Sequence, residues 1–148
     1  MRTAPPEELQ RFGTDVFQAH GAPPENASLV GTSLVKASLC GHDSHGILRI
    51  GRYIDKIRQH TLEPRAKPVI LKQHGATATV DGGNGFGQVS ATFGAELAIE
   101  IARKHGIAAV ALSRTNHVGR LADYAERIAS ERMIALMFAA GAGTGGSS

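Results

Sequence analysis

The stretch around residues 42–49 gathers polar side chains of the kind that bind small acids and move protons. It reads His42-Asp43-Ser44-His45-Gly46 and is followed by Arg49. A guanidinium can clamp a carboxylate with two parallel hydrogen bonds, and a helix start offers further N–H donors to an anion. The pattern therefore predicts a site for a small carboxylate. A capped helix with surface-exposed His45 and Arg49 explains the same residues, and the spacing alone leaves both interpretations open.

A second candidate cluster, Asn116-His117-Val118-Gly119, follows the continuous apolar stretch 107–112. Such a stretch is typical of a buried strand, and ligand sites in α/β proteins favour the carboxyl ends of strands. At that edge, His117 could act as a general acid or base because its ring titrates near neutral pH. A polar loop with a merely solvated histidine is the competing interpretation, and this cluster alone does not decide between them.

Three expected helices must position the first cluster. They cover residues 7–20, 25–40 and 44–58. An apolar stripe recurs at helical spacing in the third helix: Ile47, Ile50, Ile54 and Ile57. At about 100° per residue, His45 and Arg49 lie nearly opposite this stripe and one turn apart, so we expect them on one face. Asp43 or Ser44 is expected to cap this helix.

The second half of the chain alternates expected strands and helices. The strands are expected at 69–73, 76–81, 107–112 and 133–139, and the helices at 88–104 and 120–131. The first two strands flank His74-Gly75, which predicts a hairpin. The expected fold class is therefore α/β, with an N-terminal helical region followed by a mixed sheet with packed helices.

The glycine-rich segment 82–87 precedes a helix, as a dinucleotide-binding turn does. Its spacing, Gly83-x-Gly85-x-Gly87, differs from G-x-G-x-x-G, and no strand ending in an acidic residue follows about twenty residues later. We therefore expect a tight turn that lets the helix approach the sheet, and not a Rossmann pyrophosphate loop.

Composition and charge narrow the function classes. Of the 148 residues, 42% are hydrophobic and 20% are charged, which suits an ordinary globular domain. The net charge is +3 and the basic residues are scattered, which argues against a nucleic-acid stripe or a polybasic membrane tail. The single cysteine, Cys40, excludes an internal disulfide and is expected to be a buried, inert thiol. No apolar run approaches the roughly 18 residues of a membrane span.

Two other chemistries could use the same residues. A zinc site could recruit His42, His45 and His117, but no cysteine or second carboxylate joins the set, so we expect no metal. Ser44 with His117 could form a nucleophile pair, but the sequence has no G-x-S-x-G elbow.

Three linked stretches resemble the signatures of the type-2 malate/L-lactate dehydrogenase family, which also includes sulfolactate and ureidoglycolate dehydrogenases and imino-acid reductases. The first is Gly41-His42-Asp43-Ser44-His45-Gly46-Ile47-Leu48-Arg49 with Tyr53, the second runs from Asp81-Gly82 through Gly87-Gln88 into an alanine-rich helix, and the third is Asn116-His117-Val118-Gly119 with Tyr124. They occur in the family's order at similar spacing, and the resemblance covers about residues 5–138.

The resemblance implies a cytoplasmic, homodimeric enzyme that uses NAD or NADP to interconvert a small 2-hydroxy acid and its 2-keto acid. It also implies a cofactor-binding sheet of non-Rossmann type. By position, His117 matches the family's catalytic acid/base, and Ser44, His45 and Arg49 match its substrate-pocket residues. The resemblance leaves the identity of the acid and the cofactor-binding residues unknown.

Members of this family are considerably longer, so the chain is expected to be an N-terminal fragment. We expect three parts: a helical region at 1–66 with the substrate-site residues, an incomplete α/β portion of a cofactor domain at 67–140, and a flexible Gly/Ser tail at 141–148. The isolated chain is expected to show little or no dehydrogenase activity. The alternative is an inactive truncated module that performs no catalysis.

Overall fold

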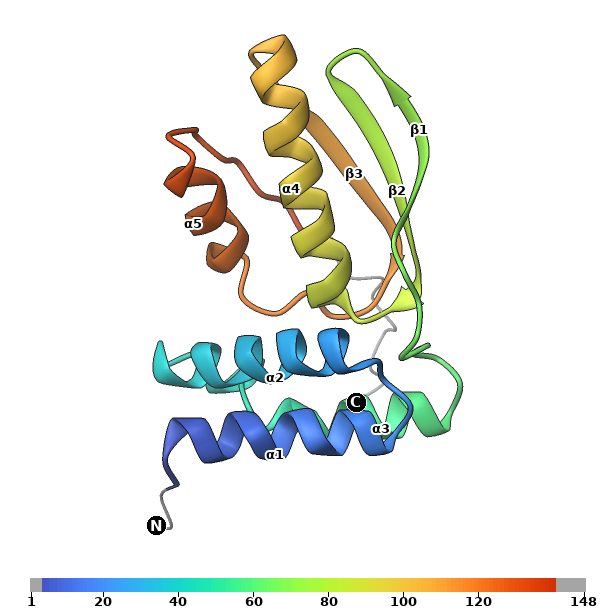
Figure 1. The fold of residues 1–148 in the computed structure, drawn as a ribbon, viewed down its shortest axis with the longest axis vertical. Helices are drawn as coiled ribbons and strands as arrows, with labels where there is room; N and C mark the ends of the chain where they lie inside the picture. The colour runs from blue at the N-terminus through green and yellow to red at the C-terminus, as the bar shows by residue number, and fades with distance from the viewer. Residues whose placement is uncertain (1–3, 141–148) are drawn as a thin grey trace, which may run out of the picture.

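The computed structural model describes residues 4–140, and its first half is a layer of helices (Figure 1). Helix α1 (Pro6–Ala19) is followed by α2 (Pro24–Leu39), a 3-10 turn η1 (Asp43–His45) and α3 (Arg49–Arg58). Both α1 and α2 begin with a proline, which suits the first helical turn because its missing N–H would find no partner there. This layer carries the first candidate cluster.

A three-stranded mixed sheet forms the second layer. Its strands are β1 (Val69–His74), β2 (Thr77–Gly85) and β3 (Ala109–Thr115), in the order β1-β2-β3. Strand β1 runs antiparallel to β2, and β3 runs parallel to β2. The hairpin at His74-Gly75 is confirmed, whereas much of the glycine-rich segment expected as a turn belongs to β2, which continues to Gly85.

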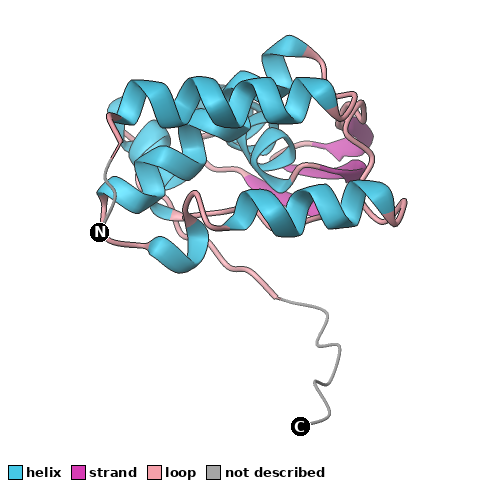
Figure 2. Ribbon diagram, turned by 90° about the horizontal axis from the view of Figure 1, so that it is seen from below, coloured by secondary structure: helices cyan, strands magenta, loops and turns pink. Residues whose placement is uncertain are grey.

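Two helices cover this sheet. Helix α4 (Gly87–His105) connects β2 to β3, and α5 (Ala122–Ser130) follows β3. Figure 1 shows α4 between α5 and the sheet, and the view from below in Figure 2 shows the helical layer in front of the strands. Leu97 and Ile101 of α4 pack against Ala78 and Val80 of β2. The expected mixed α/β architecture is therefore confirmed.

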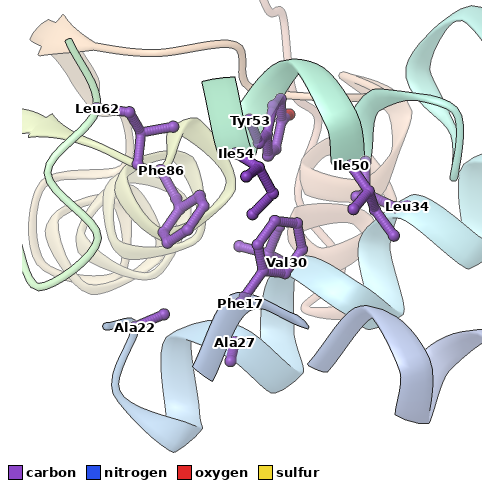
Figure 3. Close-up of a cluster of buried hydrophobic side chains, with 10 residues drawn as sticks. All are labelled: Phe17, Ala22, Ala27, Val30, Leu34, Ile50, Tyr53, Ile54, Leu62 and Phe86. Atoms are coloured by element: carbon purple, nitrogen blue, oxygen red, sulfur yellow. The ribbon is translucent and has the colours of Figure 1, made fainter. Parts of the chain in front are cut away.

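A cluster of buried apolar side chains joins the helical layer to the start of α4. Its members are Phe17, Ala22, Ala27, Val30, Leu34, Ile50, Tyr53, Ile54, Leu62 and Phe86 (Figure 3). Phe86, the residue before α4, meets Phe17 of α1 edge-on at a ring-centroid distance of 5.4 Å. This contact fixes the first turn of α4 against the helices that carry the first candidate cluster.

Residues 133–139 do not form the buried strand that their apolar composition predicts. Met137 packs against the cluster around Tyr124, but Ile134, Leu136 and Phe138 are 95%, 83% and 91% exposed. An apolar run becomes a strand only when a neighbouring strand takes its backbone hydrogen bonds. Within residues 4–140 this segment pairs with no strand, so the prediction was wrong.

Cys40 is exposed and not buried, because it is the C-terminal cap of α2 and no longer lies on the packed face of the helix. The expected tail at 141–148 lies outside the described residues. None of the described helices is both long enough and apolar enough to cross a membrane.

Candidate active site

The approach to α3 differs from the single capped helix expected at 44–58. Residues 43–45 form the 3-10 turn η1, and α3 begins only at Arg49 without a side-chain cap, so the expected capping by Asp43 or Ser44 was wrong. Instead, the Ser38 hydroxyl at the end of α2 accepts a hydrogen bond from the Ile47 N–H at 3.1 Å. A Cβ on Gly46 would lie 2.0 Å from this hydroxyl, so only glycine permits the close approach.

Arg49, Ser44 and His45 are nevertheless brought together by this turn. The Arg49 Nε donates to the Ser44 carbonyl at 2.5 Å, and the Ser44 hydroxyl lies 2.9 Å from the His45 Nδ1. Among residues 4–140, the terminal nitrogens of Arg49 have no hydrogen-bond or carboxylate partner. The guanidinium is therefore oriented by the turn and still has its planar donor pair available for a carboxylate.

The loop that carries His117 is anchored by its neighbour Asn116. The Asn116 side-chain amide donates to the carbonyls of Asn84 at 2.7 Å and Thr61 at 3.2 Å, and its oxygen accepts from the Lys56 Nζ at 2.9 Å. These bonds connect the end of β3 to the end of β2 and to α3. The loop is thus held against the helical layer although it belongs to the sheet.

Glycine at position 87 permits this arrangement. A Cβ on Gly87 would lie 2.2 Å from the His117 carbonyl oxygen and 2.4 Å from that of Asn116. Real Cβ atoms essentially never approach other atoms more closely than 3.0 Å. The first residue of α4 must therefore be glycine for the His117 loop to lie where it does.

His117 joins the two candidate clusters into one site. Its Nδ1 lies 2.7 Å from the Tyr53 hydroxyl, and its ring centroid is 5.0 Å from that of His45. The other ring nitrogen, Nε2, is buried and has no hydrogen-bond partner among the described residues. A buried, unpaired ring nitrogen is costly in a folded protein, which indicates a position that a ligand atom completes.

Tyr53 is itself fixed from behind by Gln88 of α4. The Gln88 Nε2 donates to the Tyr53 hydroxyl oxygen at 2.8 Å, and both side chains are buried, with 0% of Gln88 and 3% of Tyr53 exposed. Side chains from α4, α3 and the loop after β3 thus form one hydrogen-bonded line, Gln88–Tyr53–His117. Because these elements are far apart in sequence, the line exists only in the folded chain.

The environment of His117 disfavours its charged form. Burial, followed by the positive charges of Arg49, His45 and Lys56, lowers the pKa of His117 from 6.5 to about 4. Burial raises the pKa of Tyr53 to about 12, although the Gln88 hydrogen bond and the Arg49 charge act in the opposite direction. At neutral pH the site therefore holds an uncharged imidazole, an uncharged phenol and a free guanidinium.

All four residues singled out from the sequence, Ser44, His45, Arg49 and His117, gather here. Three further residues contact this group, although the sequence predicted no role for them: Tyr53, Lys56 and Gln88. Two of these could have been found from spacing, because Arg49, Tyr53 and Lys56 follow each other at intervals of four and three residues and so share one face of α3. No comparable periodicity marks Gln88, which lies on the buried side of a helix.

Gly82 and Gly85 do not leave an open cradle for dinucleotide phosphates. A Cβ on Gly82 would lie 2.6 Å from the Ser90 hydroxyl, and one on Gly85 would lie 2.8 Å from the Ala66 Cβ. The protein's own atoms thus occupy the space that these glycines leave, as expected for a segment that brings a helix close to a sheet. Across residues 4–140, no three His, Cys, Asp or Glu side chains come together to hold a metal ion.

Comparison with known proteins gives matches to one family along nearly the whole chain. Residues 4–143 match the sequence profile described as malate/L-lactate dehydrogenase. Hydroxycarboxylate dehydrogenase B of Escherichia coli O157:H7 is 40% identical over 132 residues, which are 89% of this chain and 37% of that protein. Malate dehydrogenase of Pyrococcus abyssi is 41% identical over 134 residues, 89% of this chain and 36% of that protein. The crystal structure of malate dehydrogenase from Entamoeba histolytica superposes with a TM-score of 0.83 at 36% identity, covering 88% of this chain and 36% of that one.

Proposed function

The chain belongs to the malate/L-lactate dehydrogenase family, and on this premise we propose that it supplies the acid-binding and proton-transfer half of an oxidoreductase site. The proposed reaction transfers a hydride between NAD or NADP and a small 2-hydroxy or 2-keto acid. The observation that carries the proposal is the buried Nε2 of His117, which has no hydrogen-bond partner among residues 4–140, in a ring whose pKa is lowered by burial and by the positive charge of Arg49.

The chain spans little more than a third of the length of the relatives that it matches. The activity of a whole enzyme, its homodimeric assembly and its cytoplasmic location are therefore part of the proposal and come from the family. A nicotinamide ring, when bound, supplies or accepts the hydride.

Arg49 is proposed to hold the substrate carboxylate. Its Nε is tied to the Ser44 carbonyl, so the guanidinium plane is set before the ligand arrives, and little side-chain freedom is lost on binding. Ser44 and His45 are linked by their own hydrogen bond and lie next to this group, where they would orient the oxygen at the reacting carbon.

His117 is proposed to exchange a proton with that oxygen through Nε2. On reduction of a 2-keto acid, the doubly protonated ring gives its Nε2 proton to the oxygen and keeps the proton on Nδ1. On oxidation of a 2-hydroxy acid, a neutral ring protonated on Nδ1 takes that proton back at Nε2. Its low pKa has burial as its main cause and the Arg49 charge as the next. A carboxylate on Arg49 offsets that charge, so binding of the substrate makes protonation of His117 easier at the moment when the proton is needed.

The proposal can be tested on the chain as it is, without a cofactor. Oxamate is a stable mimic of a 2-keto acid, and we expect it to bind with a dissociation constant on the order of millimolar, because only half of a pocket encloses it. NMR spectra should show the largest shifts at His45, Arg49 and His117.

A matched pair of variants separates a specific site from general attraction to positive charge. Arg49→Ala should abolish these shifts, whereas Arg52→Ala, which removes an exposed guanidinium from the same helix, should leave them unchanged. Equal loss in both variants, or shifts spread over the basic surface, would show that oxamate does not recognise the proposed site.

A further inference from the structure

We propose that Tyr53, held by Gln88, is a positioning residue that places the single ring proton of neutral His117 on Nε2. The catalytic meaning of this assignment rests on the proposed function, whereas its structural content rests on contacts within the chain. In the proposed function, neither Tyr53 nor Gln88 binds the acid or exchanges the substrate proton.

The hydrogen-bonding capacity of the Tyr53 hydroxyl leads to this assignment. With the Gln88 amide oriented as in the structure, the Tyr53 oxygen accepts its hydrogen at 2.8 Å, and the Gln88 Oε1 has no hydrogen-bond partner among residues 4–140. The single proton of the Tyr53 hydroxyl then needs an acceptor. Among residues 4–140 this proton has two acceptors, both on His117: the Nδ1 at 2.7 Å and the backbone carbonyl at 3.4 Å. An O–H donor prefers a partner closer than about 3.0 Å, so the proton is directed at Nδ1.

The position of the His117 proton follows from this bond. In a neutral imidazole one nitrogen carries the hydrogen and the other accepts, and the partner of one nitrogen decides the state of the other. With Nδ1 accepting from Tyr53, the ring hydrogen is on Nε2, the buried nitrogen without a partner among residues 4–140. Neutral His117 therefore presents an N–H donor to the oxygen of a bound 2-keto acid, and the ring must take up a second proton on Nδ1 before the Nε2 proton can be transferred.

The same hydroxyl also serves the charged ring. When His117 takes up a second proton, Nδ1 becomes a donor and needs an acceptor. The Tyr53 oxygen can accept from it once its own proton turns to the His117 carbonyl at 3.4 Å. Tyr53 thus has a hydrogen-bonded arrangement for each protonation state of His117 without a movement of the phenol ring, which Phe17 and Phe86 enclose at centroid distances of 6.0 and 6.1 Å.

The test is a direct measurement of the tautomer by NMR. The chain is labelled with ¹⁵N-histidine, and the His117 ring is assigned by its disappearance in His117→Gln. At neutral pH, where a pKa of about 4 leaves the ring uncharged, we expect a protonated Nε2 and an unprotonated Nδ1. Tyr53→Phe should abolish this preference and give a mixture of the two tautomers.

Tyr124→Phe is the matched control. Tyr124 is also buried, at 5% exposed, but its hydroxyl donates to the Val118 carbonyl and not to the His117 ring. This variant should leave the tautomer unchanged, and both variants keep the aromatic ring that packs in the core.

A protonated Nδ1 in the unaltered chain would overturn the proposal, because it would mean that the Gln88 amide is reversed and accepts from Tyr53. An unchanged Nε2 preference in Tyr53→Phe would overturn it as well. Neither result bears on oxamate binding at Arg49, so failure of this proposal and failure of the proposed function can be told apart.

Discussion

Replacement of Gly87 by alanine is the sharpest test of how the site is positioned. The new Cβ would lie 2.2 Å from the His117 carbonyl oxygen, and atoms of this kind do not approach closer than 3.0 Å. The loop must therefore retreat by about 0.8 Å. If that movement is directed along the bond from Tyr53 to the His117 Nδ1, it stretches a 2.7 Å contact to the limit of hydrogen bonding.

Gly87→Ala should lower the free energy of unfolding, because the new methyl group is overpacked and the contacts of the His117 loop are weakened. Overpacking of this kind destabilises by about 1–3 kcal/mol, which lowers the urea midpoint of unfolding by about 1 M for a domain of this size. A misplacement of about 1 Å at a catalytic group lowers the rate on the order of 100-fold in a complete enzyme. The ¹⁵N signals of the His117 ring should shift in the same variant, because its bond to Tyr53 changes.

Gly51→Ala provides the matched control. Gly51 lies inside α3, and no atom lies within 4 Å of the position that its Cβ would take, so alanine should stabilise this helix by up to about 1 kcal/mol. If Gly87→Ala unfolded at the same urea concentration as the unaltered chain and left the His117 signals in place, the close approach of loop and helix would be refuted.

Three further results are expected from the chain alone. The free energy of unfolding should fall by about 1 kcal/mol, after a discount for solvent screening, as the pH drops from about 6.5 to about 4. The reason is that His117 binds a proton in the unfolded chain more readily than in the folded one. In urea titrations across this pH range, the free energy of unfolding of His117→Gln should depend less on pH. Asn116→Ala should lower the free energy of unfolding by about 1–3 kcal/mol, since the carbonyls and the ammonium that it bonds lose their partner. Simultaneous replacement of Ile134, Leu136 and Phe138 by serine should reduce the fluorescence of a dye that binds exposed apolar surface. The free energy of unfolding should change by no more than about 0.5 kcal/mol. Undiminished dye fluorescence would contradict the exposure of these side chains.

Local signals in the sequence predicted those features that depend on short-range periodicity. The apolar stripe of Ile50, Ile54 and Ile57 predicted the face of α3 that packs into the core, because a helix repeats its face regardless of distant contacts. The hairpin at His74-Gly75 was predictable for the same reason, since its turn residues are adjacent.

Features that depend on a partner distant in sequence could not be predicted. The apolar run at 133–139 has a strand's composition, but a strand also needs a neighbour, and none lies beside it in the described chain. The sequence likewise could not reveal that Gln88 contacts Tyr53, because this contact depends on how α4 packs against α3. His45 and Arg49 were expected on one helix face, but Gly46 interrupts the helix, and a hydrogen bond to the Ser44 carbonyl holds Arg49 in the site instead.

The proposed exchange of the substrate proton by His117 can be tested in a chimaera. Residues 1–138 of this chain would be joined to the remaining part of hydroxycarboxylate dehydrogenase B of Escherichia coli O157:H7, and reduction of small 2-keto acids would be followed by the absorbance of NADH or NADPH. We predict that His117→Ala lowers kcat of the active chimaera by about 100-fold or more, whereas His105→Ala, at the exposed end of α4, leaves it unchanged. A His117→Ala chimaera that turns over as fast as its parent would show that His117 does not exchange this proton.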